Sequence, residues 1–132
     1  MCAQEKNMER KAVITGMGMV TPLGIGKEEN WKNLISGKSG IGPISRFDPK
    51  DLSIDIAGEV KDFKASKLIK DRKAVKLSFH SVHLAIVAAQ LAMEDSGINV
   101  EEVTPSRFGC FIGSGGGAMK MDPDSPIWSN RC

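Results

Sequence analysis

The sequence predicts an α/β fold, because segments with strand character and segments with helix character alternate along it. Apolar runs typical of strands cover residues 11–15, 54–60 and 107–112, and helical periodicity covers two longer segments between them. This alternation is typical of α/β domains, and the connections are long enough for parallel pairing of the strands. With 132 residues, the chain has the length of a single domain.

The first and third predicted strands share a glycine-rich end. Val13, Ile14 and Thr15 are consecutive β-branched residues, and the strand they form runs directly into glycines at 16 and 18. The third strand, 107–112, ends in the glycine-rich stretch 113–117. The middle strand, 54–60, instead alternates apolar and polar side chains, which predicts a half-exposed strand at a sheet edge.

Two helices are expected between these strands. In residues 27–36, Trp31, Leu34 and Ile35 recur at helical spacing, and Gly37 marks the end of the helix. The second helix is longer, ends at Gly97, and carries an apolar stripe at steps of four and three residues: Val75, Phe79, Val82, Ile86, Ala89 and Met93. Over residues 84–89 every side chain is apolar, so we expect this stretch to be enclosed on more than one side.

The composition excludes several classes of function. Lys and Arg total 18 against 16 for Asp and Glu, and Tyr is absent, so no nucleic-acid-binding surface is indicated. The longest apolar stretch has about half the length that a bilayer span needs, and residues 1–11 lack the apolar core of a secretion signal. We therefore expect a cytoplasmic protein that binds neither membrane nor nucleic acid, with its cysteines reduced: Cys2, Cys110 and Cys132.

Positive charge is concentrated at the entrance of the long helix. Six basic residues stand within thirteen positions, beside the single acid Asp71: Lys64, Lys67, Lys70, Arg72, Lys73 and Lys76. The other end of that helix is acidic, with Glu94 and Asp95, which is the reverse of what the helix dipole favours. Two interpretations are open, a solvated helix entrance and a docking patch for an acidic partner.

A glycine motif near the C-terminus offers a weak nucleotide-binding signal. Gly113-x-Gly115-x-x-Ala118 follows a predicted strand, as a dinucleotide-binding loop does. Such a loop works only if a helix begins at once to receive the pyrophosphate. Prolines at 123 and 126 leave no room for that helix, so nucleotide binding is a minor hypothesis.

Candidate reactive side chains also have simpler interpretations. His80 and His83 stand three positions apart on the long helix, where they could in principle share a metal ion. No third ligand follows at a suitable spacing, which favours packing or hydrogen bonding for this pair. Cys110 lies within a predicted strand, so we favour a buried structural thiol over a nucleophile.

Several blocks of the sequence, taken in order, resemble the start of the 3-oxoacyl-[acyl-carrier-protein] synthase II enzymes of the beta-ketoacyl synthase family. The blocks are Val13–Gly24 (VITGMGMVTPLG), Trp31–Gly42 (WKNLISGKSGIG), Arg46–Asp48 (RFD), Ala57–Phe63 (AGEVKDF), Ala92–Gly97 (AMEDSG) and Gly113–Gly117 (GSGGG). The resemblance covers residues 11–119, between a polar N-terminal extension, 1–10, and a non-matching tail, 120–132. Such a tail indicates a truncated or frame-shifted product, with a genuine short variant as the alternative.

This resemblance implies the N-terminal part of the first α/β half of a thiolase-like layered fold, in a family whose members form homodimers. It also implies a condensing enzyme of fatty-acid elongation that needs no cofactor. In that family, a cysteine at a helix N-terminus accepts an acyl group as a thioester. Two histidines then assist decarboxylation of malonyl-acyl carrier protein, and the resulting carbanion attacks the thioester while backbone N–H groups hold the oxyanion.

The resemblance carries no catalytic residue over to this chain. The family's nucleophile lies beyond the segment matched to residues 113–117, and both catalytic histidines lie in the second half of the protein. Cys110, Cys132, His80 and His83 match none of these positions. No metal-binding or cofactor-binding residue is assigned either. The chain alone is therefore expected to be inactive, and either poorly soluble or a loose dimer.

One binding surface is implied by the resemblance. Family members dock the acidic acyl carrier protein through basic residues at the entrance of the long helix, and Arg72, Lys73 and Lys76 are the positions that match. Three hypotheses follow for this chain: the N-terminal fragment of a synthase, a non-catalytic module that binds carrier protein, and nucleotide binding at residues 113–118.

Overall fold

The computed structural model describes residues 11–115, which form short strands and helices around one long helix. The elements are β1 (Val20–Thr21), β2 (Gly24–Ile25), α1 (Lys27–Ile35), β3 (Ile41–Pro43), β4 (Ile56–Gly58), α2 (Ala65–Leu68), α3 (Arg72–Leu77), α4 (His80–Ser96) and the 3₁₀ helices η1 (Val100–Glu102) and η2 (Pro105–Arg107). Strand β1 pairs with β2, and β3 pairs with β4, both in antiparallel register.

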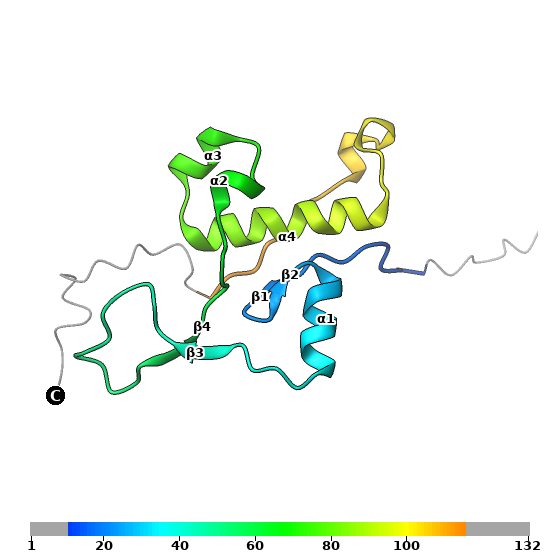
Figure 1. Cartoon of the computed structure of the whole chain (residues 1–132). Coiled ribbons are helices and arrows are strands. Elements are labelled where there is room, and N and C mark those ends of the chain that lie inside the picture. The colour runs from blue at the N-terminus through cyan, green and yellow to red at the C-terminus, as the bar shows by residue number, and fades with distance from the viewer. Residues whose placement is uncertain (1–10, 116–132) are drawn as a thin grey trace, which may run out of the picture.

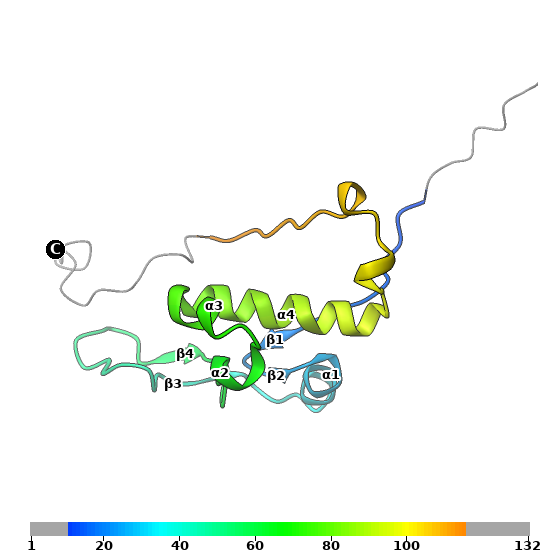
Figure 2. The same ribbon diagram turned by 90° about the horizontal axis from the view of Figure 1, so that it is seen from above.

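Helix α4 organises this part of the chain. Figure 1 shows α2 and α3 on one side of α4 and β1, β2 and α1 on the other, and Figure 2 shows the same elements from above. Both α2 and β1 contact α4. The helix is thus covered from two sides, but the enclosure predicted for residues 84–89 is only partial, because Ala89 is exposed. Val87 of α4 and Ile69 after α2 are the buried apolar residues within 11–115, only 3% and 4% exposed.

The N-terminal segment, residues 11–19, packs directly on the backbone of α4. A Cβ atom on Gly18 would lie 1.9 Å from the carbonyl oxygen of Ala88, and one on Gly16 would lie 2.4 Å from that of Ala92. Packed protein atoms do not approach each other so closely, so only glycine fits at these two positions. The two glycines therefore allow this segment to lie against the helix.

A buried asparagine fixes the β1–β2 hairpin to α1. Asn30 is only 2% exposed, and its Nδ2 donates to the carbonyl oxygens of Gly24 and Gly26 at 2.9 and 2.7 Å. Its Oδ1 accepts the hydroxyl of Thr21. These bonds satisfy the buried amide and join the turn to the helix that follows it.

Two of the three predicted strands are wrong for this structure, because residues 11–15 and 107–112 pair with no strand among the described residues, 11–115. The parallel pairing expected between strands does not occur within residues 11–115 either. A strand needs a neighbour for its backbone hydrogen bonds, and neither segment has such a neighbour among the residues described. Ile14 and Phe111 are accordingly 84% and 99% exposed.

The middle predicted strand is present as β4 but is shorter than expected. The half-exposed character of the 54–60 region is confirmed, since Ala57 is partly buried and its neighbours are exposed. The side of the strand that faces inward is the one that carries Ala57. Ile56, which lies on the apolar side that the pattern predicts to face inward, is 52% exposed. This sheet has two strands within residues 11–115, and no second layer from that part of the chain covers the face that carries Ile56.

Helices α3 and α4 replace the single helix expected from Val75 onward. At the end of α3, side chains bond to backbone carbonyl groups, and the Ser78 hydroxyl donates to the Ala74 carbonyl. Nε2 of His83 lies 3.1 Å from the carbonyl oxygen of Val75. These side-chain bonds replace the backbone bonds that a continuous helix would make there. Helix α1, in contrast, has nearly its predicted bounds.

Candidate functional site

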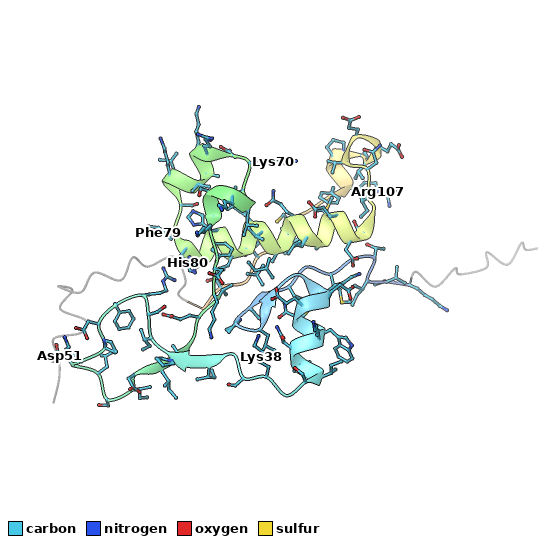
Figure 3. The ribbon with its side chains drawn as sticks, viewed as in Figure 1. Lys38, Asp51, Lys70, Phe79, His80 and Arg107 are labelled. Atoms are coloured by element: carbon cyan, nitrogen blue, oxygen red, sulfur yellow. The ribbon has the colours of Figure 1, made fainter. Side chains whose placement is uncertain are left out.

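A basic lobe stands on one side of α4. We use this name for residues 64–77, which form α2, α3 and the connection between them. Ile69 is the buried anchor of this lobe, whereas all six of its basic side chains are exposed: Lys64, Lys67, Lys70, Arg72, Lys73 and Lys76. Figure 3 shows Lys70 on the lobe and Lys38 on the opposite side of α4.

The single acid of the lobe is used to begin α3. Asp71 is the N-cap of that helix, and its Oδ1 accepts the backbone N–H groups of Lys73 at 2.8 Å and Ala74 at 3.2 Å. An aspartate in this position satisfies two N–H groups that have no partner within the helix. The carboxylate therefore holds α3 in place instead of pairing with a basic side chain.

The three residues that the family resemblance selected lie on one face of α3. At 100° per residue, Arg72, Lys73 and Lys76 fall within one quarter or so of the helix circumference. Like charges at Arg72 and Lys76, four positions apart, repel each other, and basic residues in a first turn oppose the helix dipole. This arrangement lowers helix stability, so local folding alone gives no reason for it.

An exposed apolar side chain borders these charges. Leu77 is the last residue of α3 and is 83% exposed, and Phe79 after it is 44% exposed. Isolated apolar side chains on a surface are ordinary. Here, however, the apolar group lies directly beside Lys76, so the surface of the lobe is both basic and partly apolar.

None of the six basic residues of the lobe forms an ion pair within residues 11–115. The two ion pairs found there join Lys27 to Asp95 and Lys50 to Asp48. Unpaired, exposed cations that gather on one surface attract an acidic partner more strongly than the net charge of +2 would suggest.

Both histidines of α4 have structural contacts. The rings of His80 and Phe63 meet edge to face, with centroids 5.3 Å apart and planes at 84°. Burial, followed by the positive charges of Arg46 and His83, lowers the pKa of His80 below its ordinary 6.5. His83 caps α3 as described above. Packing and hydrogen bonding, favoured from the sequence, are therefore what the structure gives these residues.

The expectation for Cys110 is wrong, because its side chain is exposed rather than buried. The cause is that no strand among residues 11–115 pairs with residues 108–112, so no sheet in that part of the chain covers them. No group of three metal-ligating side chains occurs among the residues described. Cys2, Cys132 and residues 116–118 of the Gly113–Ala118 motif lie outside those residues, so the structure does not test the nucleotide hypothesis.

A shallow cavity of ≈ 340 Å³ lies beside the β3–β4 sheet. It is lined by Gly40, Gly42, Pro43, Ser45, Ala57, Glu59, Lys61 and Asp62. One of its two carboxylates, that of Glu59, already accepts the Ser45 hydroxyl at 2.6 Å and the backbone N–H groups of Ser45 and Arg46. The hydrogen bond from Ser45 is the main cause that lowers the pKa of Glu59. The Glu59 carboxylate therefore holds the loop at Ser45 and Arg46 in place.

Comparison with known families identifies the fold that these elements belong to. The family model described as "Beta-ketoacyl synthase, N-terminal domain" matches residues 9–128. The chain belongs to the beta-ketoacyl synthase family. The matched range includes α4 and the whole basic lobe, and it extends past residue 119, where the blocks of resemblance end.

Individual relatives are synthases of this family. A 3-oxoacyl-[acyl-carrier-protein] synthase 2 from Synechocystis sp. is 40% identical over 119 residues, which are 89% of this chain and 28% of that protein. One from Coxiella burnetii is 42% identical over 111 residues, which are 84% of this chain and 27% of that protein. The chain thus spans little more than a quarter of the length of these relatives.

A solved ketosynthase has a similar backbone. "The ishigamide ketosynthase/chain length factor" matches 69% of this chain and 22% of its own, with a TM-score of 0.62 and 32% identity. The predicted fold class is confirmed: the chain is the N-terminal part of the thiolase-like fold of ketoacyl synthases, built from helices and strands. Within residues 11–115, no helix is long and apolar enough to cross a bilayer.

Sequence reasoning overlooked two features of the candidate surface. The break between α3 and α4, where Ser78 and His83 bond to carbonyl groups of α3, makes the basic residues part of a separate lobe. The exposure of Leu77 was also overlooked, because it lies outside the predicted apolar stripe.

Proposed function

We propose that this chain is the N-terminal portion of a beta-ketoacyl-acyl carrier protein synthase. The intact enzyme would condense malonyl-acyl carrier protein with an acyl-enzyme thioester in fatty-acid elongation, as a homodimer in the cytoplasm. The observation that carries this proposal is the match of residues 9–128 to the N-terminal domain of the family. The names of the relatives from Synechocystis sp. and Coxiella burnetii support the same substrate class.

We propose further that the chain alone does not catalyse condensation. Ketoacyl synthesis needs a thiolate supported by a helix N-terminus and two histidines beside it. Among residues 11–115, the thiol of Cys110 stands on an unpaired segment, while His80 and His83 are engaged with Phe63 and Val75. These residues therefore have structural roles in the proposal.

The basic lobe is proposed as the docking surface for acyl carrier protein, with Arg72, Lys73 and Lys76 at its centre. Its support is physical: exposed cations that form no ion pair within residues 11–115, an aspartate used to hold α3, and a charge arrangement that costs helix stability. Electrostatic docking of this kind steers an acidic protein and weakens as salt rises.

An activity assay tests the enzymatic part. The purified 132-residue chain is incubated with acyl and malonyl thioesters of carrier protein, and 3-oxoacyl product is followed by mass spectrometry. We expect no product above the background of the Cys110→Ser variant. Condensation by the wild-type chain that disappears in Cys110→Ser would show that the chain has its own active thiol and would overturn this part of the proposal.

A titration with acyl carrier protein at two salt concentrations tests the docking part. Reversing Arg72, Lys73 and Lys76 to glutamate is expected to weaken binding at least about tenfold at low salt. Reversal of Lys32, Lys38 and Lys50, on the opposite side of α4, makes the same change in net charge and is expected to have little effect. Equal losses from the two triple variants would contradict a docking site on the lobe.

The alternative function is a binding module without catalysis, and one observation favours it: the basic lobe is complete within the described residues. Both functions predict binding of carrier protein. They differ in the encoding DNA, where a synthase requires a codon for a cysteine followed by a helical pattern, and later two histidine codons, beyond codon 132 in one of the three frames. Their absence would favour the binding module.

A further inference from the structure

The loop between β3 and β4 is held at the same end of α4 as the basic lobe. Figures 1 and 2 both place this loop, residues 44–55, and α3 at the end where α4 begins. Glu59, directly after β4, accepts the Ser45 hydroxyl at 2.6 Å and the backbone N–H groups of Ser45 and Arg46 at 3.0 and 3.2 Å. The start of the loop therefore has a fixed place relative to β4.

The chain after Glu59 leads directly to the start of α4. Asp62 has a φ of +56°, in the left-handed region, and turns the chain there. The next residue, Phe63, packs edge to face on His80, the first residue of α4, which Figure 3 shows at this end of the helix. Burial, followed by the positive charge of Arg46, lowers the pKa of His80, so the Arg46 guanidinium also lies near this ring.

We propose that Arg46 is a further docking residue for acyl carrier protein, and that Glu59 is the positioning residue that holds it beside the basic lobe. This proposal rests on the docking function proposed above and extends that surface to a second part of the chain. The lobe begins at Lys64, directly after Phe63, so Arg46 and the lobe both adjoin the start of α4. Cations at two separate places on a surface fix the orientation of an acidic partner as well as attracting it.

The charges of the loop show where this surface ends. Arg46 is exposed, and its backbone rather than its side chain bonds to Glu59, which leaves the guanidinium to face a partner. Residues 47–55 hold three acids and a single base, Lys50, whose ammonium group lies 2.7 Å from the Asp48 carboxylate. These acids repel an acidic partner. The proposed surface therefore includes the start of the loop and excludes the rest of it.

A titration with acyl carrier protein tests the role of Arg46. The 132-residue chain carries Arg46→Gln, which keeps the backbone N–H that Glu59 accepts. The matched control, Lys50→Gln, removes the same charge from the same loop. Arg46→Gln is expected to weaken binding about threefold or more at low salt and by a smaller factor at high salt, because the lost interaction is electrostatic. Lys50→Gln should have little effect, and Arg46→Lys, which keeps the charge, should bind nearly as well as the wild type.

Two outcomes distinguish this inference from the docking function on which it rests. Equal effects of Arg46→Gln and Lys50→Gln, with binding still weakened by reversal of the lobe residues Arg72, Lys73 and Lys76, would overturn the role of Arg46 alone. Binding that is unchanged by reversal of the three lobe residues would overturn both proposals.

A double-mutant cycle tests the role of Glu59. Glu59→Ala frees the start of the loop, although the loss of a negative charge should by itself favour an acidic partner. If Glu59 acts through Arg46, then Glu59→Ala weakens binding about twofold or more in the wild-type chain and does not weaken it in Arg46→Gln. Circular dichroism checks that each variant keeps its helices. Weakening of the same size in both backgrounds, or tighter binding in both, would overturn the positioning role.

Discussion

Lys27 and Asp95, 68 positions apart in the sequence, form an ion pair that joins the start of α1 to the last turns of α4. The other oxygen of the same carboxylate accepts the backbone N–H of Met17 at 3.0 Å. One side chain therefore ties together three segments that are distant in the sequence. It also explains why an acid stands near the C-terminus of α4 although the helix dipole disfavours it there.

Replacing Asp95 by asparagine is expected to loosen the N-terminal segment. Asparagine can still accept the N–H of Met17, but it cannot pair with the Lys27 ammonium group. Amide hydrogens of residues 11–19 should then exchange about threefold to tenfold faster, because the segment opens more often. Asp48→Asn, which removes only the exposed pair with Lys50, is the control and should leave this exchange unchanged.

The same pair predicts a defined dependence of stability on pH. The hydrogen bond from Lys27, followed by that from Met17, lowers the pKa of Asp95 below 3.8, and the bond with Asp95 raises the pKa of Lys27 above 10.5. The contribution of Asp95 to the free energy of unfolding is present above about pH 4 and is lost as the pH falls through its lowered pKa. The contribution of Lys27 is present below about pH 10 and is lost as the pH rises through its raised pKa. The difference in urea midpoint between wild type and Asp95→Asn should be constant from pH 5 to 9 and shrink toward pH 3. A difference that grows on acidification would contradict the pairing.

The lowered pKa of His80 predicts a loss of stability at higher pH values than the loss expected from Asp95. The pKa of His80 is lowered in the folded chain, so the unfolded chain binds a proton more readily, and stability falls as pH drops below about 6.5. His80→Phe keeps an aromatic ring against Phe63 and removes this titration. The urea midpoint of wild type should fall between pH 7.5 and 5.5, and the fall should be smaller in His80→Phe. Equal falls would show that His80 is not the group responsible.

Gly18→Ala tests the close approach between the N-terminal segment and α4. The added methyl group would lie 1.9 Å from the Ala88 carbonyl oxygen, with backbone and not a flexible side chain in its way. We expect a loss of about 2–3 kcal/mol in unfolding free energy, because the segment must move away from the helix. Gly42→Ala is the matched control, since a Cβ there meets nothing within 4 Å, and it should change stability by less than about 0.5 kcal/mol. Similar values for both variants would contradict the packing.

Local signals in the sequence were sufficient for α1. Glu28 and Glu29 in its first turn and Gly37 after its end act within a few residues of the helix, and α1 has nearly the predicted bounds. The break before α4 depends instead on the bond from His83 to the Val75 carbonyl across eight positions. Apolar periodicity runs straight through that break, so it could not be predicted.

Strands depend on neighbours that local patterns do not supply. Residues 11–15 and 107–112 have strand composition, yet no sheet forms around them among the residues described, and the burial expected for Cys110 fails for the same reason. The basic residues of the candidate surface were found by counting charges, which needs no structure. Their common face on α3 and the exposed Leu77 beside them required the fold.

The most direct test of the central claim is to map acyl carrier protein onto the isotopically labelled chain by nuclear magnetic resonance. The chain is titrated at low salt, and the shifts of its backbone amides are followed residue by residue. The docking proposal predicts that the largest changes fall in residues 64–77, and that they vanish when Arg72, Lys73 and Lys76 are reversed to glutamate. Changes centred on α1 or on the β3–β4 sheet, and unaffected by that reversal, would contradict it.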